Sequence, residues 1–211
     1  MEESVFGSEF SEWSKKQDRP KSEDKSLKNN ILLYLHDFVT LLAGVLLVFL
    51  LLFRIVVVDG ISMENTLVHG DYLLLVSSVF YTEPQQGDII VASKDSFENG
   101  EPIIKRVIAT EGQTVDIDFN TGIVYVDGSA LDETYTKTPT NLKEGVQFPL
   151  TVEDGCVFAM GDHRNRSKDS RSTEIGLIDN REIIGKAIFL CYPGGGEEGK
   201  DFDITRIGVI S

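Results

Sequence analysis

The chain has 211 residues, a net charge of −14 and 41% hydrophobic residues, which suits one domain with short appendages and excludes disorder throughout. Its 34 acidic residues outnumber 20 basic ones and no basic stripe is present, which argues against a nucleic-acid binder. The cysteines and histidines are few and scattered, so we expect no metal site and no cofactor; they are Cys156, Cys191, His36, His69 and His163.

Residues 1–30 are polar and rich in Ser and Lys, which predicts a disordered tail. An apolar run follows, and its segment from Phe38 to Phe53 is uncharged. We predict one transmembrane helix over residues 31–56, because about 20 helical residues span the hydrocarbon. The run is apolar on every face, unlike a surface helix of a soluble protein. The polar residues before it, and the lack of a small-residue cleavage site after it, disfavour a cleaved signal peptide.

The positive charges beside this run predict its orientation in a cell membrane. No Lys or Arg lies between Ile55 and Ser93, whereas six precede the run. Because positively charged flanks stay in the cytoplasm, we expect a cytoplasmic N-terminus and an extracytoplasmic domain over residues 57–211. The six are Lys15, Lys16, Arg19, Lys21, Lys25 and Lys28.

The segment 57–211 is typical of a mainly β domain. Short runs rich in Val, Ile, Phe and Tyr alternate with turn signals such as Asn99-Gly100 and Asp127-Gly128. No convincing helical period is present after residue 60. We therefore predict an antiparallel, partly closed, barrel-like sheet system. The expected strands lie within 72–80, 88–93, 103–109, 114–118, 122–128, 156–162 and 182–192.

Ser62 and Lys105 are candidate reactive groups. Ser62 follows Gly60, and a tight turn there would present its hydroxyl and its N–H toward one point. His69 and His163 qualify as its base only if they fold close to it. Lys105 shares a strand face with apolar neighbours, and burial would have to lower its pKa from about 10.4 by about three units, at about 4 kcal/mol. The same pattern also fits a solvated lysine on a half-exposed strand.

Four segments, in this order after a single anchor, resemble the conserved boxes of bacterial type I signal peptidases. They are Gly60-Ile61-Ser62-Met63-Glu64-Asn65-Thr66-Leu67, Gly87-Asp88-Ile89-Ile90, Lys105-Arg106-Val107-Ile108 and Gly161-Asp162-His163-Arg164-Asn165-Arg166-Ser167-Lys168-Asp169-Ser170-Arg171. The single-span layout is similar to that of Gram-positive members. The resemblance implies a membrane-bound serine endopeptidase of mainly β fold that removes signal peptides from secreted preproteins after small residues of the Ala-x-Ala type.

The resemblance also implies roles for single residues. Ser62 matches the nucleophile, and Lys105 matches the general base that later protonates the leaving amine. Ser167 matches a residue that orients the lysine amine by a hydrogen bond. The oxyanion would be held by the Ser62 N–H and by a second donor near Gly60, which must be backbone or water because glycine has no hydroxyl.

The segment 161–171 carries the predicted supporting cluster. Asp169 and Arg171 match an ion pair of the family, and Asp162 lies in the same polar cluster. Positions 167, 169 and 171 share one face if the backbone is extended. A solvated loop is the alternative interpretation of this segment.

The sequence departs from the family pattern at three positions. Asn65 stands where proline is usual, and we expect the turn after the nucleophile to be looser without a fixed φ. Ala109 replaces a usual glycine and requires a backbone without positive φ. His163 stands where asparagine is common. None of the three removes a catalytic group, so we expect activity, on a narrower set of substrates.

Position along the chain supports a membrane-inserted substrate. Ser62 is eight residues beyond Arg54, so an extended chain keeps it within roughly 30 Å of the bilayer surface. A preprotein could bind there as an added strand, for which the segment Ile55–Val58 would offer an edge.

Three alternatives remain from the sequence alone. The first is an inactive anchored relative that assembles or binds surface fibres. The second is a different Ser/Lys protease, such as the self-cleaving repressors. The third is a membrane-anchored β-domain whose role the sequence does not reveal. The membrane span and the acidic balance disfavour the repressors. Cys156 and Cys191 are expected to be small buried hydrophobes, with a disulfide as the alternative outside the cell.

Overall fold

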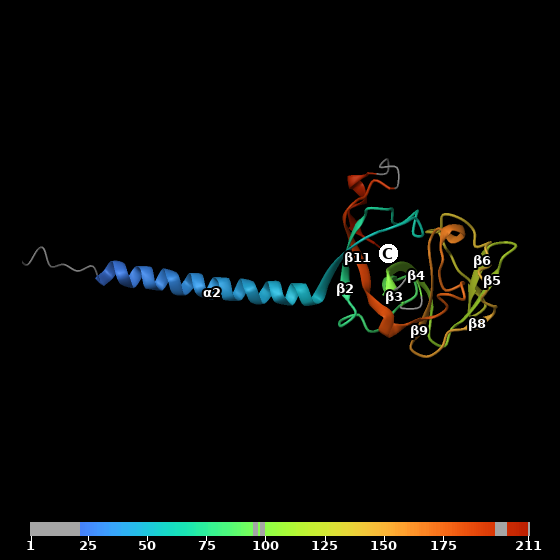
Figure 1. Ribbon diagram of the computed structural model, residues 1–211, viewed down its shortest axis with the longest axis horizontal. Helices are drawn as coiled ribbons and strands as arrows, with labels where there is room; N and C mark the ends of the chain where they lie inside the picture. Colours follow the sequence, from blue (N-terminus) through green and yellow to red (C-terminus); the bar gives the residue numbers. More distant parts are fainter. Residues whose placement is uncertain (1–21, 95–96, 98–99, 197–201, 211) are drawn as a thin grey trace, which may run out of the picture. The chain divides into compact units, whose positions relative to one another are not determined.

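The computed structural model describes residues 22–94, 97, 100–196 and 202–210. The chain divides into two units, Met1–Phe49 and Leu50–Ser211, and each is described by itself. Figure 1 shows the long helix α2 (Ser22–Leu52) and the strand-rich part that follows it in sequence. Within α2, the 23 residues Asn30–Leu52 have a mean hydropathy of 2.4, and none of the most apolar window is buried. This helix has the length and composition of a membrane anchor.

The bounds of α2 differ from those predicted. The helix begins at Ser22, inside the segment predicted to be a disordered tail, while residues 1–21 lie outside the described part. It ends at Leu52, and strand β1 (Phe53–Val57) takes up residues that we assigned to the transmembrane helix. Residues 55–57 are β-branched and pair with β2, which favours strand over helix there.

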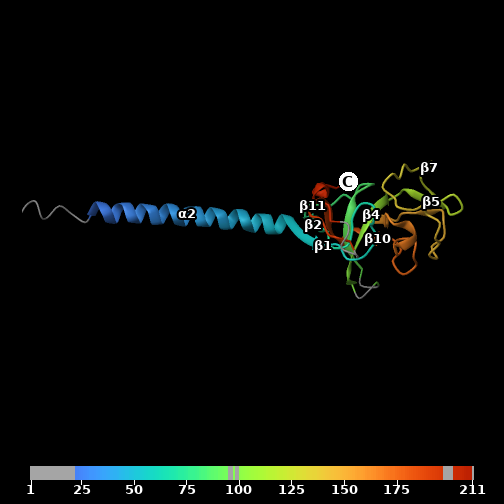
Figure 2. The ribbon, with the colours of Figure 1, turned by 90° about the horizontal axis from the view of Figure 1, so that it is seen from above.

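Two antiparallel sheets form the second unit, and Figures 1 and 2 show their strands from two directions. The larger has the order β1-β2-β11-β3-β4-β9-β10, with β12 beside β11; the smaller has the order β7-β6-β5-β8. Antiparallel pairing throughout the described strands confirms the predicted mainly β fold. The larger sheet comprises β1, β2 (Tyr72–Ser77), β3 (Ile89–Ser93), β4 (Pro102–Thr110), β9 (Cys156–Met160), β10 (Ile178–Asp179), β11 (Ile183–Tyr192) and β12 (Gly208–Val209).

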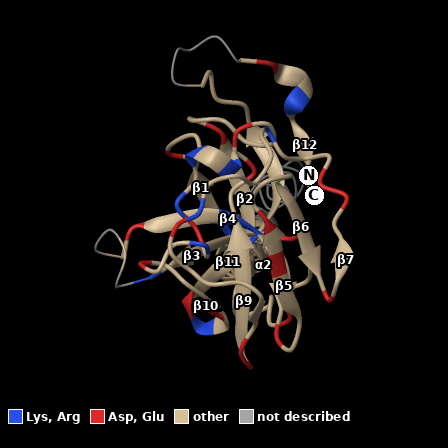
Figure 3. Ribbon diagram, turned by 90° about the vertical axis from the view of Figure 1, so that its right-hand side faces the viewer, with Lys and Arg blue, Asp and Glu red and all other residues tan. Residues whose placement is uncertain are grey.

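Among the described residues, the smaller sheet and three 3-10 helices of three residues each complete the unit. The 3-10 helices lie in connections, and η2 lies within the polar segment 161–171. In Figure 3 the charged residues lie mostly on loops. The remaining elements are β5 (Thr114–Asp118), β6 (Ile123–Val126), β7 (Ser129–Ala130), β8 (Leu150–Thr151), η2 (Arg164–Arg166), η3 (Asn180–Glu182) and η4 (Ile204–Arg206).

Strand β4 runs through the apolar core and is buried along most of its length. Its side chains join three clusters: Ile104 the first, Ile103 and Val107 the second, and Ile108 the third. Successive side chains point to opposite faces of a strand, so apolar side chains cover both faces of β4. Lys105, in the middle of this strand, is therefore surrounded by hydrophobic residues.

The cysteines do not fit the prediction of two small buried hydrophobes. Cys191 is exposed and Cys156 is half-buried, and the two thiols are free. Cys191 lies at the end of β11, where the alternating burial of that strand gives way to two exposed residues. Burial raises the pKa of the Cys156 thiol.

Candidate active site

Ser62 lies in the turn that follows β1, and this turn is anchored on both sides. The Val58 N–H donates to Asp71 O at 2.8 Å and the Gly70 N–H donates to Val58 O at 2.9 Å, which extends the β1–β2 pairing. After Ser62, the side chain of Met63 is buried in the core. The chain turns at Gly60, whose φ of 94° is in the region that glycine adopts without strain. Ser62 is thus held between the β1–β2 hydrogen bonds on one side and the buried side chain of Met63 on the other.

Lys105 meets Ser62 directly, although 43 residues separate them in the chain. The Lys105 amine lies 2.9 Å from Ser62 Oγ and 3.0 Å from Ile104 O, and the lysine side chain is only 4% exposed. This burial contradicts the alternative of a solvated lysine on a half-exposed strand. A serine hydroxyl within hydrogen-bond reach of a buried amine has the geometry of a nucleophile and its base.

The two histidine rings of this unit contact other groups. His163 donates its backbone N–H to Ser62 O at 3.0 Å, but its Nδ1 lies 3.1 Å from Glu64 Oε2. Lys137 contacts the same carboxylate at 2.7 Å. That hydrogen bond holds the pKa of Glu64 below its usual value, against the opposing effect of burial. His69 lies beside Gly60, whose backbone N–H donates to its Nδ1 at 3.3 Å.

The contact with His69 bears on the predicted oxyanion donors. Because the Gly60 N–H already donates to His69, it would have to leave that ring before it could hold an oxyanion. The Ser62 N–H remains the predicted first donor. The second donor near Gly60 stays a prediction.

The predicted supporting residues Ser167, Asp169 and Arg171 form one buried cluster. Ser167 Oγ donates to Asp169 Oδ2 at 2.8 Å, and Arg171 donates to Asp169 through Nε and Nη2, both at 2.8 Å. The Gly161 N–H adds a fourth hydrogen bond at 3.0 Å. Burial opposes the Asp169 charge most strongly, but these donors together hold the pKa of the carboxyl below its usual range. The predicted ion pair is therefore present, in a buried segment and not in a solvated loop.

Gly161 brings this cluster close to Ser62. A Cβ at position 161 would collide with Ser167 Oγ and with Ser62 O, so only glycine allows the two segments to approach so closely. Ser167 thus lies against the backbone of Ser62. Its predicted hydrogen bond with the Lys105 amine stays a prediction.

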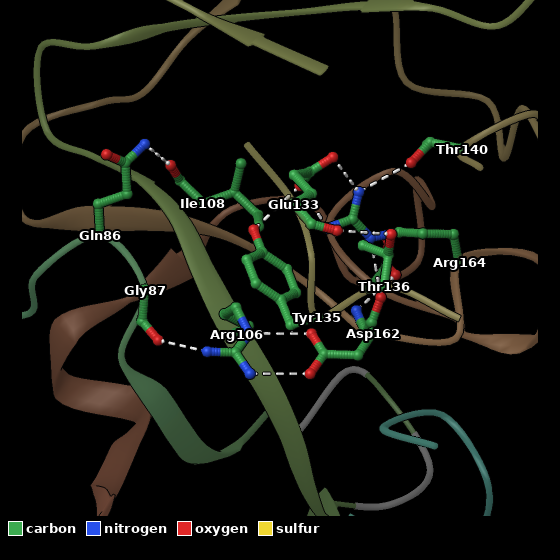
Figure 4. A network of polar contacts seen from close by, with 12 residues as sticks. Gln86, Gly87, Arg106, Ile108, Glu133, Tyr135, Thr136, Thr140, Asp162 and Arg164 are labelled. Carbon is green, nitrogen blue, oxygen red and sulfur yellow. Dashed lines mark hydrogen bonds and ion pairs between the residues drawn. The ribbon is translucent and has the colours of Figure 1, made fainter. Parts of the chain in front are cut away.

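Asp162 belongs to a second buried network, drawn in Figure 4. Its carboxylate accepts from Arg106 Nε at 3.0 Å and from Nη2 at 2.9 Å, and from the Thr66 hydroxyl at 2.6 Å. Asp162 therefore pairs with Arg106, the neighbour of Lys105, and not with Arg171. The bidentate pair connects the strand that carries Lys105 to the segment after β9, and Thr66 joins the turn that carries Ser62 to the same carboxylate.

Three members of this network escaped the sequence analysis. The Tyr135 ring lies 4.1 Å from the Arg106 guanidinium carbon, and Glu133 accepts from Arg164 Nη1 at 2.9 Å. The pKa of Tyr135 is raised by burial first and by the Glu133 charge second. Glu133 and Tyr135 lie in a loop without periodicity, so no sequence signal pointed to them. Arg164 lies in the segment 161–171, but the sequence predicted no role for it.

Asn65 keeps the turn after Ser62 in a conformation that proline cannot adopt. Its φ is 100°, and its side-chain amide donates to Tyr135 O at 2.9 Å. The prediction of a looser turn is therefore wrong. The hydrogen bond from Asn65 to a distant loop holds the turn in place of a proline ring. Ala109 has no positive φ, as expected.

Asn65→Pro should therefore destabilise the protein, although proline is usual here in the family that the sequence resembles. Proline fixes φ near −65°, so we expect the free energy of unfolding to fall by more than about 1 kcal/mol and turnover to fall with it. Asn65→Gly, which accepts positive φ, is the matched control and should be less affected. Urea unfolding followed by circular dichroism checks this. A proline variant as stable as the parent would contradict the geometry of the turn.

A groove of about 490 Å³ opens beside Ser62 and Lys105. One wall is the segment 56–63 and the other is 101–105, with Phe97, Arg166 and Lys168 also lining it. Among the described strands, β1 lies at the end of the larger sheet, and β9 pairs with β4 only from Arg106 onward. Among the described residues, no group of three His, Cys, Asp or Glu side chains is placed to hold a metal ion.

Comparisons with known proteins identify the family. Residues 31–192 match the family model "Signal peptidase, peptidase S26". The chain is 32% identical over 182 residues to a signal peptidase I of Bacillus licheniformis, which covers 82% of this chain and 95% of that one. It is 41% identical over 139 residues to a probable signal peptidase I-1 of Synechocystis, covering 63% of this chain and 67% of that one.

One solved structure is also similar. It is a signal peptidase I from Enterococcus faecalis, 29% identical, with a TM-score of 0.41 over 50% of this chain and 97% of that one. The family model covers most of the chain, including helix α2 from Ile31, the turn that carries Ser62 and the strand that carries Lys105. The chain therefore belongs to the signal peptidase I family of S26 serine peptidases.

Proposed function

We propose that this enzyme removes N-terminal signal peptides from secreted preproteins with Ser62 as nucleophile and Lys105 as general base. The observation that carries the proposal is the 2.9 Å contact between the amine of the buried Lys105 and Oγ of the half-buried Ser62. Burial disfavours a charged ammonium, and a neutral amine is what a base requires.

The chemistry follows in two steps. The neutral Lys105 amine takes the hydroxyl proton as Ser62 Oγ attacks the scissile carbonyl, and the Ser62 N–H stabilises the oxyanion. The C–N bond then breaks as the ammonium returns its proton to the leaving amine, which leaves an acyl-enzyme. Water, deprotonated by the same lysine, attacks the ester, and the ammonium returns that proton to Ser62 Oγ as the Oγ–acyl bond breaks and the signal peptide leaves. Ser167 and Asp169 act as positioning residues behind the lysine.

The groove supports an extended substrate. A peptide that runs between the 56–60 and 102–104 segments can form hydrogen bonds with their backbones, as an added strand does. Its alternate side chains then point into the groove, where the exposed Val57 and the half-buried Ile61 offer apolar contacts. Small residues at positions −3 and −1 of the preprotein suit this arrangement.

We propose that α2 anchors the enzyme in the membrane, with the N-terminus in the cytoplasm and the residues after the helix outside. The six positive charges before the apolar run support this orientation. A membrane-impermeant maleimide tests it, because the exposed thiol of Cys191 should react in intact cells and Cys191→Ser should not. Labelling of Cys191 only after lysis would place the residues after the helix in the cytoplasm and contradict the proposed orientation.

Cleavage of a preprotein tests the function itself. Detergent-purified full-length protein is incubated with a preprotein that carries an Ala-x-Ala site, and the products are mapped by mass. We expect one cut after the second alanine. The alternative, an inactive relative that binds surface fibres, predicts no cut, with Ser62 and Lys105 as remnants. The close contact of the two side chains favours the enzyme.

A further inference from the structure

Two basic side chains, Arg166 and Lys168, line the groove on either side of Ser167. Both residues are exposed, whereas Ser167 is buried. The backbone at Ser167 is extended, with φ −124° and ψ 126°. Because Ser167 itself is buried, it is the exposed Arg166 and Lys168 that present their side chains to the groove that they line.

These cations share the groove with Ser62. Ser167 packs near the carbonyl of Ser62 beside Gly161, and the same carbonyl accepts the His163 N–H at 3.0 Å. Arg166 and Lys168 are the chain neighbours of Ser167. A substrate whose scissile carbonyl lies at Ser62 Oγ would therefore lie in a groove that both cations line.

Arg166 is the more available of the two. It forms no ion pair with any residue that the structure describes. Lys168 contacts Glu174 at 2.5 Å and lies 5.6 Å from the centre of the Phe97 ring. That pair is exposed to solvent on both sides, so it neutralises the lysine only partly.

Two acidic residues are among the described lining residues of the groove. Glu101 precedes Pro102 at the start of β4, four residues and about 13 Å from Lys105 along the strand. Asp59 is 3.2 Å from His69 Nδ1, and 94% of its side chain is exposed. Among the described lining residues, the cations thus flank Ser167 in sequence, whereas Glu101 lies at the start of β4 and Asp59 contacts His69.

We infer that this enzyme prefers preproteins with an acidic side chain within two residues of the cleaved bond, and that Arg166 determines this preference. The inference rests on the proposed function and specifies its substrates. A carboxylate beside the cleavage site gains a favourable ionic contact with Arg166, to which Lys168 adds. Such contacts in a solvated groove are modest and weaken with salt.

Matched substrates test the inference. Ala-x-Ala preproteins are made with Glu, Gln or Lys at position x, and at the first or second residue after the cut, and kcat/KM is measured with the full-length enzyme. We expect the Glu substrate to exceed the Gln substrate by about three- to fivefold at one or more positions at low salt. The preference should shrink as salt rises from about 0.05 to about 0.5 M.

Charge reversal separates specificity from structure. Arg166→Gln should bring the Glu-to-Gln ratio near one, and Arg166→Glu should favour the Lys substrate at the same position. Arg181→Gln removes an exposed arginine of η3 outside the groove and should keep the original ratio. Equal ratios in Arg166→Glu and the parent, or no preference at any position, overturn the inference. Correct cleavage without preference leaves the proposed function standing, whereas no cleavage of any substrate overturns both.

Discussion

Lys105→Met is expected to lower kcat by about 10⁴-fold while the fold stays intact. Methionine keeps an unbranched apolar chain in the buried middle of β4, but it has no amine to take the proton of Ser62. Ser62→Ala should be equally inactive, because the two groups act as a unit. Lys143→Met, at an exposed position, is the matched control. Cleavage of an Ala-x-Ala preprotein and far-UV circular dichroism report activity and fold.

The pH dependence of the parent enzyme gives a second readout of the same role. A lysine base works only when neutral, so kcat/KM should rise with pH and be lost as pH falls. A solvated lysine would place the midpoint near 10.4, and burial at Lys105 should place it lower. Substantial cleavage by Lys105→Met, above about 1% of the parent kcat, would contradict the assignment and direct attention to His163.

Local patterns in the sequence were enough to predict the elements that carry the site. β-branched runs bounded by turn residues predicted the strands, and a long uncharged run predicted the helix. The meeting of Ser62 and Lys105 was not contained in these patterns. Their separation of 43 residues is closed only by the pairing of β4 within the larger sheet. The prediction of that pair came from the family resemblance.

The parts that escaped prediction depend on contacts between distant segments. Asn65 donates a hydrogen bond to a loop that lies 70 residues further along the chain. Arg106 pairs with Asp162, and 56 residues separate the two in sequence. Periodicity predicts on which face of a helix or strand a side chain lies, but not which loop covers that face. The predicted end of α2 was wrong for a related reason: Phe53, Ile55 and Val56 are apolar and suit a membrane helix, yet pairing with β2 decides their structure.

Asp169→Asn should cost about 3 to 5 kcal/mol of stability, because it leaves the buried Arg171 without its counter-charge. Both carboxylate oxygens accept hydrogen bonds: Oδ1 from Arg171 Nε, and Oδ2 from Gly161, Ser167 and Arg171 Nη2. An asparagine amide group would face a donor in either orientation. Urea unfolding of the full-length protein in detergent, followed by circular dichroism, measures the loss. Glu174→Gln, which breaks only the exposed pair with Lys168, should change stability little.

The pH dependence of this loss has a defined sign. The folded-state pKa of Asp169 is lowered, so its stabilising contribution is complete above the unfolded value of about 3.9 and is lost as pH falls through the folded value. The stability difference between parent and Asp169→Asn should therefore stay constant between about pH 5 and 8 and shrink below about pH 4. A difference that is independent of pH down to about pH 3 would mean that the Asp169 charge does not stabilise the fold. If stability falls as predicted and turnover falls with it, the ion pair supports the nucleophile through Ser167 and Gly161, the two residues that join the buried pair to Ser62.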